Sequence, residues 1–135
     1  MNFKHTALDL IEDKKIVFTA LSKHYFFFRM HICKFVFEQN CVPVNPFMIF
    51  DYFLLDTVNR DLIRNGNNNL LKRADELWVF GDISNGVLAE IKIAQSLNMP
   101  IKYFKIENYL SILQISKEEL KFEDEVKDFQ NEIVL

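Results

Sequence analysis

The sequence predicts an α/β fold: a Rossmann-like, doubly wound sandwich whose mainly parallel sheet has four to five strands flanked by helices. The first observation is that four short apolar runs, rich in β-branched and aromatic residues, recur at 15–20, 41–45, 77–80 and 100–106. Runs of this kind are typical of strands that are buried on both faces of a sheet. The second observation is that helix-like segments separate these runs, and such alternation indicates parallel strands joined by crossover helices.

The size and composition are those of one globular domain. We expect this domain to span residues 1–135, with its core at about 15–106 and a C-terminal helix or tail at 107–135. Hydrophobic residues make up 50% of the chain and charged residues 26%, which is ordinary for a globular protein. The net charge of -3 argues against binding to nucleic acid, because that binding draws most of its affinity from a basic surface.

The chain shows no targeting or membrane segment. Its start, 1–15, is polar and charged, unlike a signal peptide. The most apolar run, 25–37, is too short to span a bilayer and contains charged residues. The two cysteines are too few for a disulfide framework and are expected to stay reduced. We therefore expect a soluble, cytoplasmic protein without membrane contact.

The first half of the chain predicts two helices around the first strand. Residues 1–13 predict a short helix. Three of its side chains are expected to turn inward: Phe3, Leu8 and Ile11. After the strand at 15–20, a helix is expected from Ser22 or Lys23 to Asn40, with Ser22 as its N-cap. This helix is apolar around most of its circumference, so we expect one face on the sheet and another in a homodimer or higher homo-oligomer.

The middle of the chain predicts an edge strand followed by short helices. The second strand contains Pro43, which cannot donate a ladder hydrogen bond and therefore indicates an edge position or the start of a strand. The aromatic stretch 47–55 predicts a loop with a helical turn over the carboxyl edge of the sheet. A helix over 56–64 is expected to stop at Asn65-Gly66, and a second short helix, capped by Asn67–Asn69, to run to Arg73.

The second half predicts a strand, a capped helix and a charged C-terminal segment. The strand at 77–80 leads through a polar turn to a helix that is capped by Ser84 and ends at Asn98. We assign no element to 107–115. From Ser116 to about Asn131 the pattern predicts a charged helix or, alternatively, a disordered tail. The expected apolar anchors of this helix are Leu120, Val126 or Phe129.

Doubly wound sheets bind ligands in the crevice at the carboxyl ends of their strands. The residues predicted to line this crevice follow the first and third strands: Ala20, Leu21, Ser22, Asp82, Ser84, Asn85 and Gly86. Ser84 and the small residues after it open a helix, where free N–H groups can hold an anion such as phosphate. Glu90 falls inside the apolar arc of the same helix. A carboxylate placed there either has a functional reason or bends out to solvent.

The motifs exclude several kinds of site. The three histidines and two cysteines lack the spacing of metal ligands, so we expect no metal. No Gly-x-Gly-x-x-Gly motif, Walker loop or nucleophile elbow is present, and no cofactor is expected. What remains is acidic: Asp75, Asp82 and Glu90. Carboxylates without a metal suit the cleavage of a glycosidic bond, although Asp75 and Asp82, taken singly, are more simply turn residues.

One set of motifs matches a known family: Ala74–Gly81, Ser84–Gly86, Glu90, Ala94 and Pro100-Ile101. With these motifs the chain resembles the nucleoside 2-deoxyribosyltransferase-like superfamily, in particular its small bacterial and phage branch. The resemblance implies a Rossmann-like fold and attack by a glutamate on C1′ of a deoxyribonucleoside or its 5′-monophosphate. The base then leaves, and another base or water resolves the glycosyl-enzyme ester.

The resemblance also implies roles for single residues. Glu90 matches the nucleophile, and Asp75 matches the aspartate at the start of the strand. Ser84 and Gly86 match the motif that holds the 5′ end of the sugar or its phosphate. Active members of this superfamily carry a glycine-containing loop after the first strand. Here that loop is Ala20–His24, in which Leu21 and Lys23 are expected to crowd the pocket.

Three kinds of function therefore stay open at the level of the sequence. The first is an enzyme, an N-deoxyribosyltransferase or N-glycosidase that acts on a nucleoside or nucleotide through Glu90. The second is a module that binds a nucleotide or another phosphorylated ligand without turning it over. The third is an oligomerising protein with a vestigial site.

Overall fold

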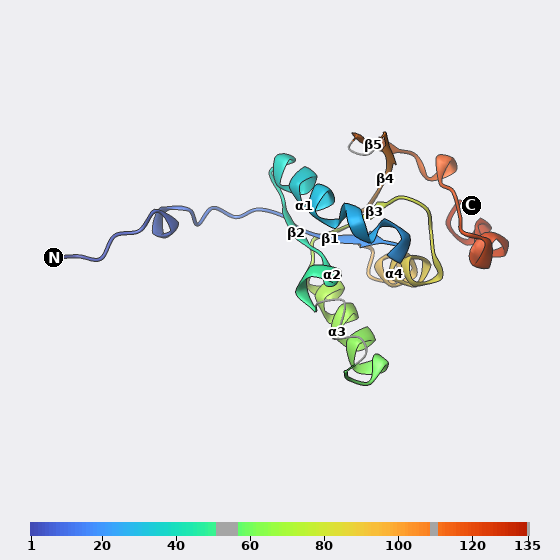
Figure 1. Cartoon of the computed structure of the whole chain (residues 1–135), viewed down its shortest axis with the longest axis horizontal. Helices are drawn as coiled ribbons and strands as arrows, with labels where there is room; N and C mark the ends of the chain where they lie inside the picture. Colours follow the sequence, from blue (N-terminus) through green and yellow to red (C-terminus); the bar gives the residue numbers. More distant parts are fainter. Residues whose placement is uncertain (51–56, 109–110, 135) are drawn as a thin grey trace.

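The computed structural model describes residues 1–50, 57–108 and 111–134, and it confirms the predicted fold class. Its sheet has five strands in the order β2-β1-β3-β4-β5 (Figure 1). The strands are β1 (Ile16–Leu21), β2 (Val42–Val44), β3 (Glu76–Phe80), β4 (Ile101–Glu107) and β5 (Ser111–Ile115). The first four pair in parallel, and β5 runs antiparallel to β4. The strand β5 lies in the stretch to which the sequence pattern assigned no element. The strand β2 lies at an edge of the sheet, which is one of the two alternatives that Pro43 indicated.

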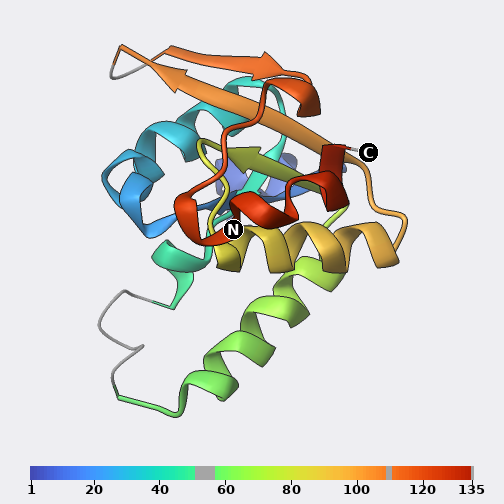
Figure 2. The ribbon, with the colours of Figure 1, turned by 90° about the vertical axis from the view of Figure 1, so that its right-hand side faces the viewer.

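Helical segments cover both faces of the sheet (Figure 2). One face carries the 3₁₀ helix η2 (Lys23–Phe28) and helix α1 (Arg29–Glu38). The other carries α3 (Arg60–Arg73), α4 (Asn85–Ser96) and the C-terminal segment. Because side chains alternate along a strand, β3 serves both layers. Its Trp78 and Phe80 pack on the α1 side, whereas Leu77 and Val79 pack on the α4 side.

The strand order places a topological switch point between β1 and β3. From β1 the chain crosses to β2 on one side, and it then returns past β1 to β3 on the other. The register pairs Leu21 with Phe80, so the carboxyl ends of β1 and β3 lie level with each other. At such a point the loops after the two strands leave toward opposite faces of the sheet. Doubly wound sheets bind their ligands in the crevice between these loops.

Helix α3 corrects the prediction that a helix ends at Asn65-Gly66. The helix runs without a break to Arg73, and its N-cap is Asn59, whose side chain accepts a hydrogen bond from the N–H of Asp61. Gly66 lies inside this helix, and a Cβ at this position would lie 3.3 Å from the ring of Phe50. The glycine is thus the point at which the helix approaches that ring, and Asn67–Asn69 are helix-interior residues. The predicted start at Asp56 lies outside the described residues, and the predicted helical turn nearby is α2 (Pro46–Ile49).

The prediction for the N-terminal segment is wrong. Residues 1–13 hold only the short 3₁₀ helix η1 (Thr6–Asp9), and the segment extends away from the sheet (Figure 1). The three side chains expected inside are exposed: Phe3, Leu8 and Ile11. A helix this short is not stable in water without a surface to pack against, which explains the difference.

The Phe-rich helix has the two faces that were predicted, although its first part is a 3₁₀ helix and the α-helix begins only at Arg29. Ile32 and Val36 are fully buried against the sheet. Three apolar side chains of the same segment are exposed: Phe27, Met30 and Phe37. The predicted contact between copies through this face stays a prediction. In the parts of the chain that the structure describes, no helix is both long and apolar enough to cross a membrane.

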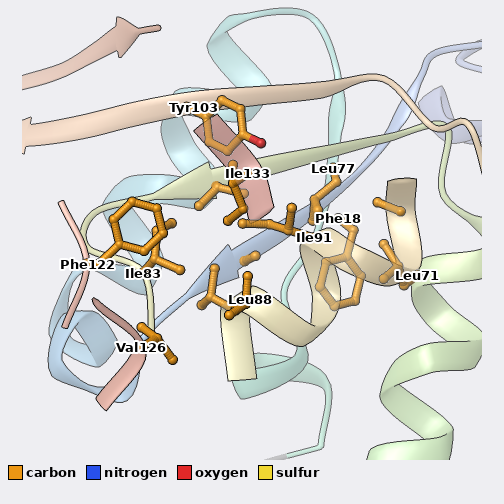
Figure 3. Close-up of a cluster of buried hydrophobic side chains, with 14 residues drawn as sticks. Phe18, Leu71, Leu77, Ile83, Leu88, Ile91, Tyr103, Phe122, Val126 and Ile133 are labelled. Carbon is orange, nitrogen blue, oxygen red and sulfur yellow. The ribbon is translucent and has the colours of Figure 1, made fainter. Parts of the chain in front are cut away.

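The C-terminal segment folds back onto the loop after β3, so both alternatives predicted for it are wrong. A β-bridge joins Ile83 to Phe122, with hydrogen bonds of 2.9 and 2.8 Å on either side. Phe122, Val126 and Ile133 are buried in the core on this face (Figure 3). The helices here are short: η4 (Lys117–Glu119), η5 (Asp124–Phe129) and α5 (Asn131–Val134). Of the predicted anchors, Val126 is buried, Leu120 is partly buried and Phe129 is exposed.

Candidate active site at the carboxyl edge of the sheet

A cavity of about 1070 Å³ opens at the carboxyl edge of the sheet, a size that suits a small-molecule ligand. Its walls come from the segments after β1, β2 and β3, from α3 and α4, and from the C-terminal segment. The structure brings most of the predicted site residues together in these walls: Leu21, Ser22, Asp82, Ser84, Asn85, Gly86 and Glu90. Ala20 and Asp75 are not among the described lining residues. Ala20 is buried in the core.

The segment after β1 forms one wall. The Ser22 side chain caps η2 by accepting a hydrogen bond from the N–H of His24, as the sequence predicted for an N-cap. Leu21 and Lys23, which were expected to crowd the pocket, both line the cavity. They do not close it, because the volume that remains is still that of a ligand site.

The loop from β3 to α4 forms the facing wall. Gly81 has a φ of 83°, and a Cβ there would lie 2.6 Å from the ring of Tyr25, so only glycine fits. Asp82 lies beside the Tyr25 hydroxyl, and burial raises the pKa of that tyrosine. Ser84 caps α4, because its Oγ accepts a hydrogen bond from the N–H of Val87 at 3.3 Å. A Cβ at Gly86 would meet nothing within 4 Å.

Glu90 lies in the second turn of α4 and lines the cavity. Its Oε2 accepts a 2.8 Å hydrogen bond from Nδ2 of Asn67 on α3. Within the described ranges the carboxylate has no cationic partner. Burial raises the pKa of Glu90 to about 7, and the hydrogen bond from Asn67 opposes only part of that rise. A half-buried carboxylate that is held by one amide and faces an open cavity is available to react with a ligand.

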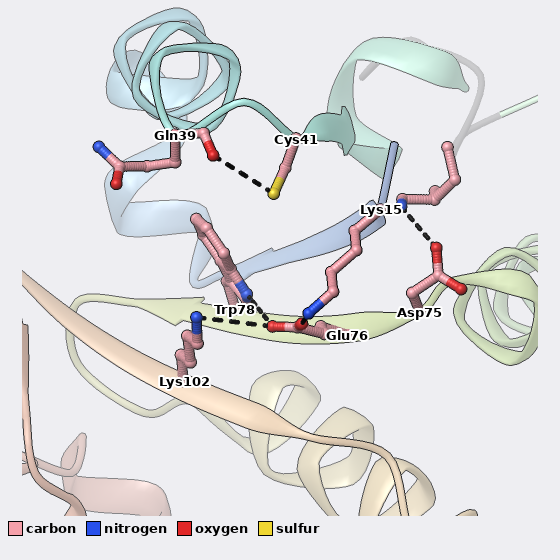
Figure 4. Close-up of polar contacts among 8 residues, drawn as sticks. Lys15, Gln39, Cys41, Asp75, Glu76, Trp78 and Lys102 are labelled. Atoms are coloured by element: carbon pink, nitrogen blue, oxygen red, sulfur yellow. Dashed lines mark hydrogen bonds and ion pairs between the residues drawn. The ribbon is translucent and has the colours of Figure 1, made fainter. Parts of the chain in front are cut away.

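Asp75 lies at the amino edge of the sheet, away from this cavity. It accepts a 2.7 Å hydrogen bond from the N–H of Ile16 (Figure 4). Its neighbour Glu76 is buried and accepts hydrogen bonds from Nζ of Lys15 at 2.8 Å and Nε1 of Trp78 at 2.9 Å. Burial acts to raise the pKa of Glu76, but these hydrogen bonds and the charge of Lys102 outweigh it, and the pKa is lowered. The structure therefore does not bring Asp75 together with Glu90.

Ser22, His24 and Glu123 form a contact that only looks like a catalytic relay. Ser22 Oγ and Glu123 Oε2 approach the same ring nitrogen, Nδ1 of His24, at 3.3 and 3.1 Å. A serine–histidine–acid relay needs the hydroxyl on one ring nitrogen and the carboxylate on the other. Among the described residues, no three His, Cys, Asp or Glu side chains gather in a way that could hold a metal ion.

Sequence reasoning missed two parts of the site. Asn67 was assigned to a helix cap, whereas its spacing of four residues from Ile63 and of four from Leu71 places it on the inner face of a continuous helix. The second part is the acidic stretch Glu123–Glu125, which lines the cavity from the C-terminal segment. Only the long-range bridge between Ile83 and Phe122 brings this stretch to the site, and no local pattern signals that bridge.

Comparison with known proteins finds a matching family model and similar solved structures. A family model described as a domain of unknown function (DUF7768) matches residues 22–104. Among solved structures, a 2-desoxiribosyltransferase from Leishmania mexicana is similar with a TM-score of 0.54 and 16% sequence identity, over 85% of this chain and 87% of that chain. No protein with a curated description matches the sequence. At this identity the structural likeness shows the fold, and it confirms the fold that the resemblance implied.

Proposed function

The chain belongs to the family of the domain of unknown function DUF7768, and we propose that it is an enzyme that cleaves the N-glycosidic bond of a deoxyribonucleoside or its 5′-monophosphate. The observation that carries this proposal is the position of Glu90, a carboxylate with a raised pKa that faces a ligand-sized cavity. The likeness of the fold to a 2-desoxiribosyltransferase supports the substrate class. The matching motifs around Ser84 and Glu90 support it independently.

In the proposed reaction the ionised Glu90 attacks C1′ of the sugar. The bond from C1′ to the base nitrogen breaks, and the bonding electron pair leaves with the base, which takes up a proton. An ester then joins the sugar to Glu90 until a second base or a water molecule attacks C1′ and releases the carboxylate. Because the pKa of Glu90 is about 7, roughly half of this group is ionised at neutral pH.

The cavity also offers surfaces for the rest of the substrate. Its apolar side chains include Phe47, Phe50 and Ile63, and flat aromatic rings are suited to stack on a base. Asp82 lines the cavity from the loop after β3 and is our candidate for a polar contact with the base or sugar. Asp75 has no place in this scheme, because it lies at the opposite edge of the sheet.

A second candidate function, binding without turnover, is favoured by one observation. Leu21 and Lys23 stand in the wall where active members of the resembling superfamily have a glycine-containing loop. Bulkier side chains in this wall can hold a ligand slightly away from the carboxylate of Glu90, and a ligand held there is bound without reaction.

One assay tests both candidates. Base release is measured from the deoxynucleosides and from their 5′-monophosphates, for the wild type, Glu90→Ala and the control Glu38→Gln, which changes an exposed glutamate of α1 outside the cavity. We expect release by the wild type and the control, and a rate at least about a thousandfold lower for Glu90→Ala. Equal rates in wild type and Glu90→Ala contradict the enzymatic proposal. Binding of a nucleoside with no release of base supports the second candidate instead.

A further inference from the structure

An N-terminal arm precedes the first strand and leaves its apolar side chains in solvent. This arm, residues 1–14, extends away from the sheet and holds the short 3₁₀ helix η1 (Figure 1). Four of its large apolar side chains are between 58% and 81% exposed: Phe3, Leu8, Leu10 and Ile11. A projecting segment with this much exposed apolar surface is typical of a contact with another molecule.

The arm carries the periodicity of an amphipathic helix. Phe3, Ala7, Leu10 and Ile11 stand at i, i+4, i+7 and i+8, the spacing that lies along one face of an α-helix. A helix this short forms in water only when its apolar face packs on a surface. The described part of one copy of the chain gives these side chains no such surface. The helix that the sequence predicts for this segment therefore needs a surface from outside the copy.

The Phe-rich segment offers an exposed apolar face of matching size. Phe27, Met30 and Phe37 recur at intervals of three and seven residues along η2 and α1, and they are 84%, 65% and 61% exposed. Helix α2 widens this face, because its half-exposed Met48 lies with Sδ 3.6 Å from Sγ of Cys33 on α1. A helix over residues 3–11 is about 14 Å long, and the stretch 27–37 is about 16 Å long. The helix is thus long enough to cover the face.

The charges of the two segments are complementary. Residues 8–13 contain three acidic residues and no basic one, and residues 23–34 contain three basic residues and no acidic one: Asp9, Glu12 and Asp13, against Lys23, Arg29 and Lys34. The ion pairs that Glu12 and Lys34 make within the copy are local, with Lys14 at 3.5 Å and Glu38 at 3.8 Å. Exposed local pairs of this kind contribute little free energy. The charges therefore favour the arm as the occupant of this face.

We propose that the N-terminal arm of one copy folds into an amphipathic helix on the Phe27, Met30 and Phe37 face of a second copy, and that two copies exchange their arms in this way. A twofold exchange covers both arms and both faces at once. The arm can reach, because 14 extended residues span up to about 45 Å. The inference is independent of the proposed function, since neither the arm nor this face is among the described residues that line the cavity.

Sedimentation of the full chain tests the contact. The variants are Leu10→Asp in the arm, Phe37→Asp on the face and the control Leu62→Asp on α3. All three side chains are more than half exposed in the single copy, so these changes remove no core packing, and circular dichroism checks that each variant is folded. We expect the wild type and the control to form a dimer. Leu10→Asp and Phe37→Asp should each raise its dissociation constant at least about tenfold, because a carboxylate enters an apolar contact.

Photochemical cross-linking shows whether the arm docks on its own copy or on a second one. Chains that carry benzoylphenylalanine at position 3 are prepared unlabelled and with heavy nitrogen, and are mixed, diluted and concentrated again. We expect cross-links from the arm to peptides of 27–37, with heavy arms joined to light faces and the reverse. A monomeric wild type, a dimer that both aspartate variants leave intact, or cross-links confined to single chains would overturn the exchange.

Discussion

Glu76 and Glu90 stand at opposite edges of the same sheet, and the protein treats the two carboxylates in opposite ways. At the amino edge, Glu76 is enclosed by Lys15, Trp78 and Lys102, and these partners lower its pKa. At the carboxyl edge, the amide of Asn67 is the partner that Glu90 has among the described residues, and burial raises the pKa of Glu90 to about 7. The difference teaches that burial alone does not mark a functional acid. A buried acid whose charge is balanced by cations and hydrogen-bond donors has a structural role. A buried acid with few such partners is available for chemistry.

Neutralising each glutamate in turn should give the largest difference between the two edges. Glu90→Gln is expected to lower the rate of base release by at least about a thousandfold, because the amide cannot act as the nucleophile. Glu76→Gln is expected to keep the kcat of the wild type. Rates are measured under conditions where circular dichroism shows both variants folded. If Glu76→Gln loses as much activity as Glu90→Gln, the division of roles between the two edges fails.

The next largest effect concerns the two glycines of the loop after β3. Gly81→Ala is expected to destabilise the protein by about 3 kcal/mol, because alanine is strained at a φ of 83° and its Cβ meets the Tyr25 ring. A Cβ at Gly86 would meet nothing within 4 Å, so Gly86→Ala is expected to change the free energy of unfolding by less than about 1 kcal/mol. Because Gly86 lines the cavity, the same change is expected to weaken nucleoside binding by about tenfold. Denaturant unfolding and calorimetry measure the two quantities. Equal destabilisation by the two variants would show that a Cβ at Gly86 meets other atoms, which contradicts the open space beside this residue.

The two glutamates should give the stability of the protein opposite dependences on pH. The lowered pKa of Glu76 contributes stability above about pH 4.5, and this is lost as the pH falls through its folded pKa. The raised pKa of Glu90 has the opposite effect on stability: the free energy of unfolding falls as the pH rises from about 4.5 to about 7.

At pH 8 the free energy of unfolding of Glu90→Gln, measured with urea, should therefore exceed that of the wild type by about 2 kcal/mol. At pH 4 the two free energies should differ little. Glu76→Gln should be less stable than the wild type at pH 8, by about 1 kcal/mol, and this difference should shrink at pH 3. If both variants change the free energy of unfolding in the same direction at pH 8, the assignment of opposite environments to the two glutamates is contradicted.

The smallest effect comes from Asn67, which donates a hydrogen bond to Glu90. The rate of base release by the wild type is expected to rise with pH around a midpoint near 7, because the nucleophile must be ionised. The hydrogen bond from Asn67 lowers the pKa of Glu90, so Asn67→Ala should move this midpoint to higher pH and reduce the rate at pH 6 by about threefold. A midpoint that stays in place shows that Asn67 does not support the ionised form. Asn69→Ala, a change on the same helix outside the cavity, is the matched control.

Local patterns predicted much of the fold and part of the site. The apolar runs located the four parallel strands, and Ser84 marked the start of α4. The helical period of α4 put Glu90 on its inner side. Local rules failed where distant residues decide the structure. Gly66 lies inside α3, where the Phe50 ring of a distant segment packs against it, and it does not end the helix.

The remaining differences have the same origin. The N-terminal residues have no surface to pack on, and the strand β5 is defined by its pairing with β4. Asp75 looked like a partner of Glu90 because both belong to one strand–turn–helix unit. However, the whole length of β3 lies between them. Asp75 precedes the first residue of β3, whereas the cavity that holds Glu90 lies beyond the carboxyl end of this strand.

The central claim is that Glu90 forms a covalent bond with the sugar. The most direct test treats the protein with a 2′-fluorinated deoxynucleoside, whose electron-withdrawing fluorine slows breakdown of the ester, and then locates the adduct by mass spectrometry of peptides. We predict one added fluorosugar on the peptide that contains Glu90 in the wild type, and none in Glu90→Gln. Release of the base with the sugar attached to another residue, or an adduct that persists in Glu90→Gln, would contradict the claim.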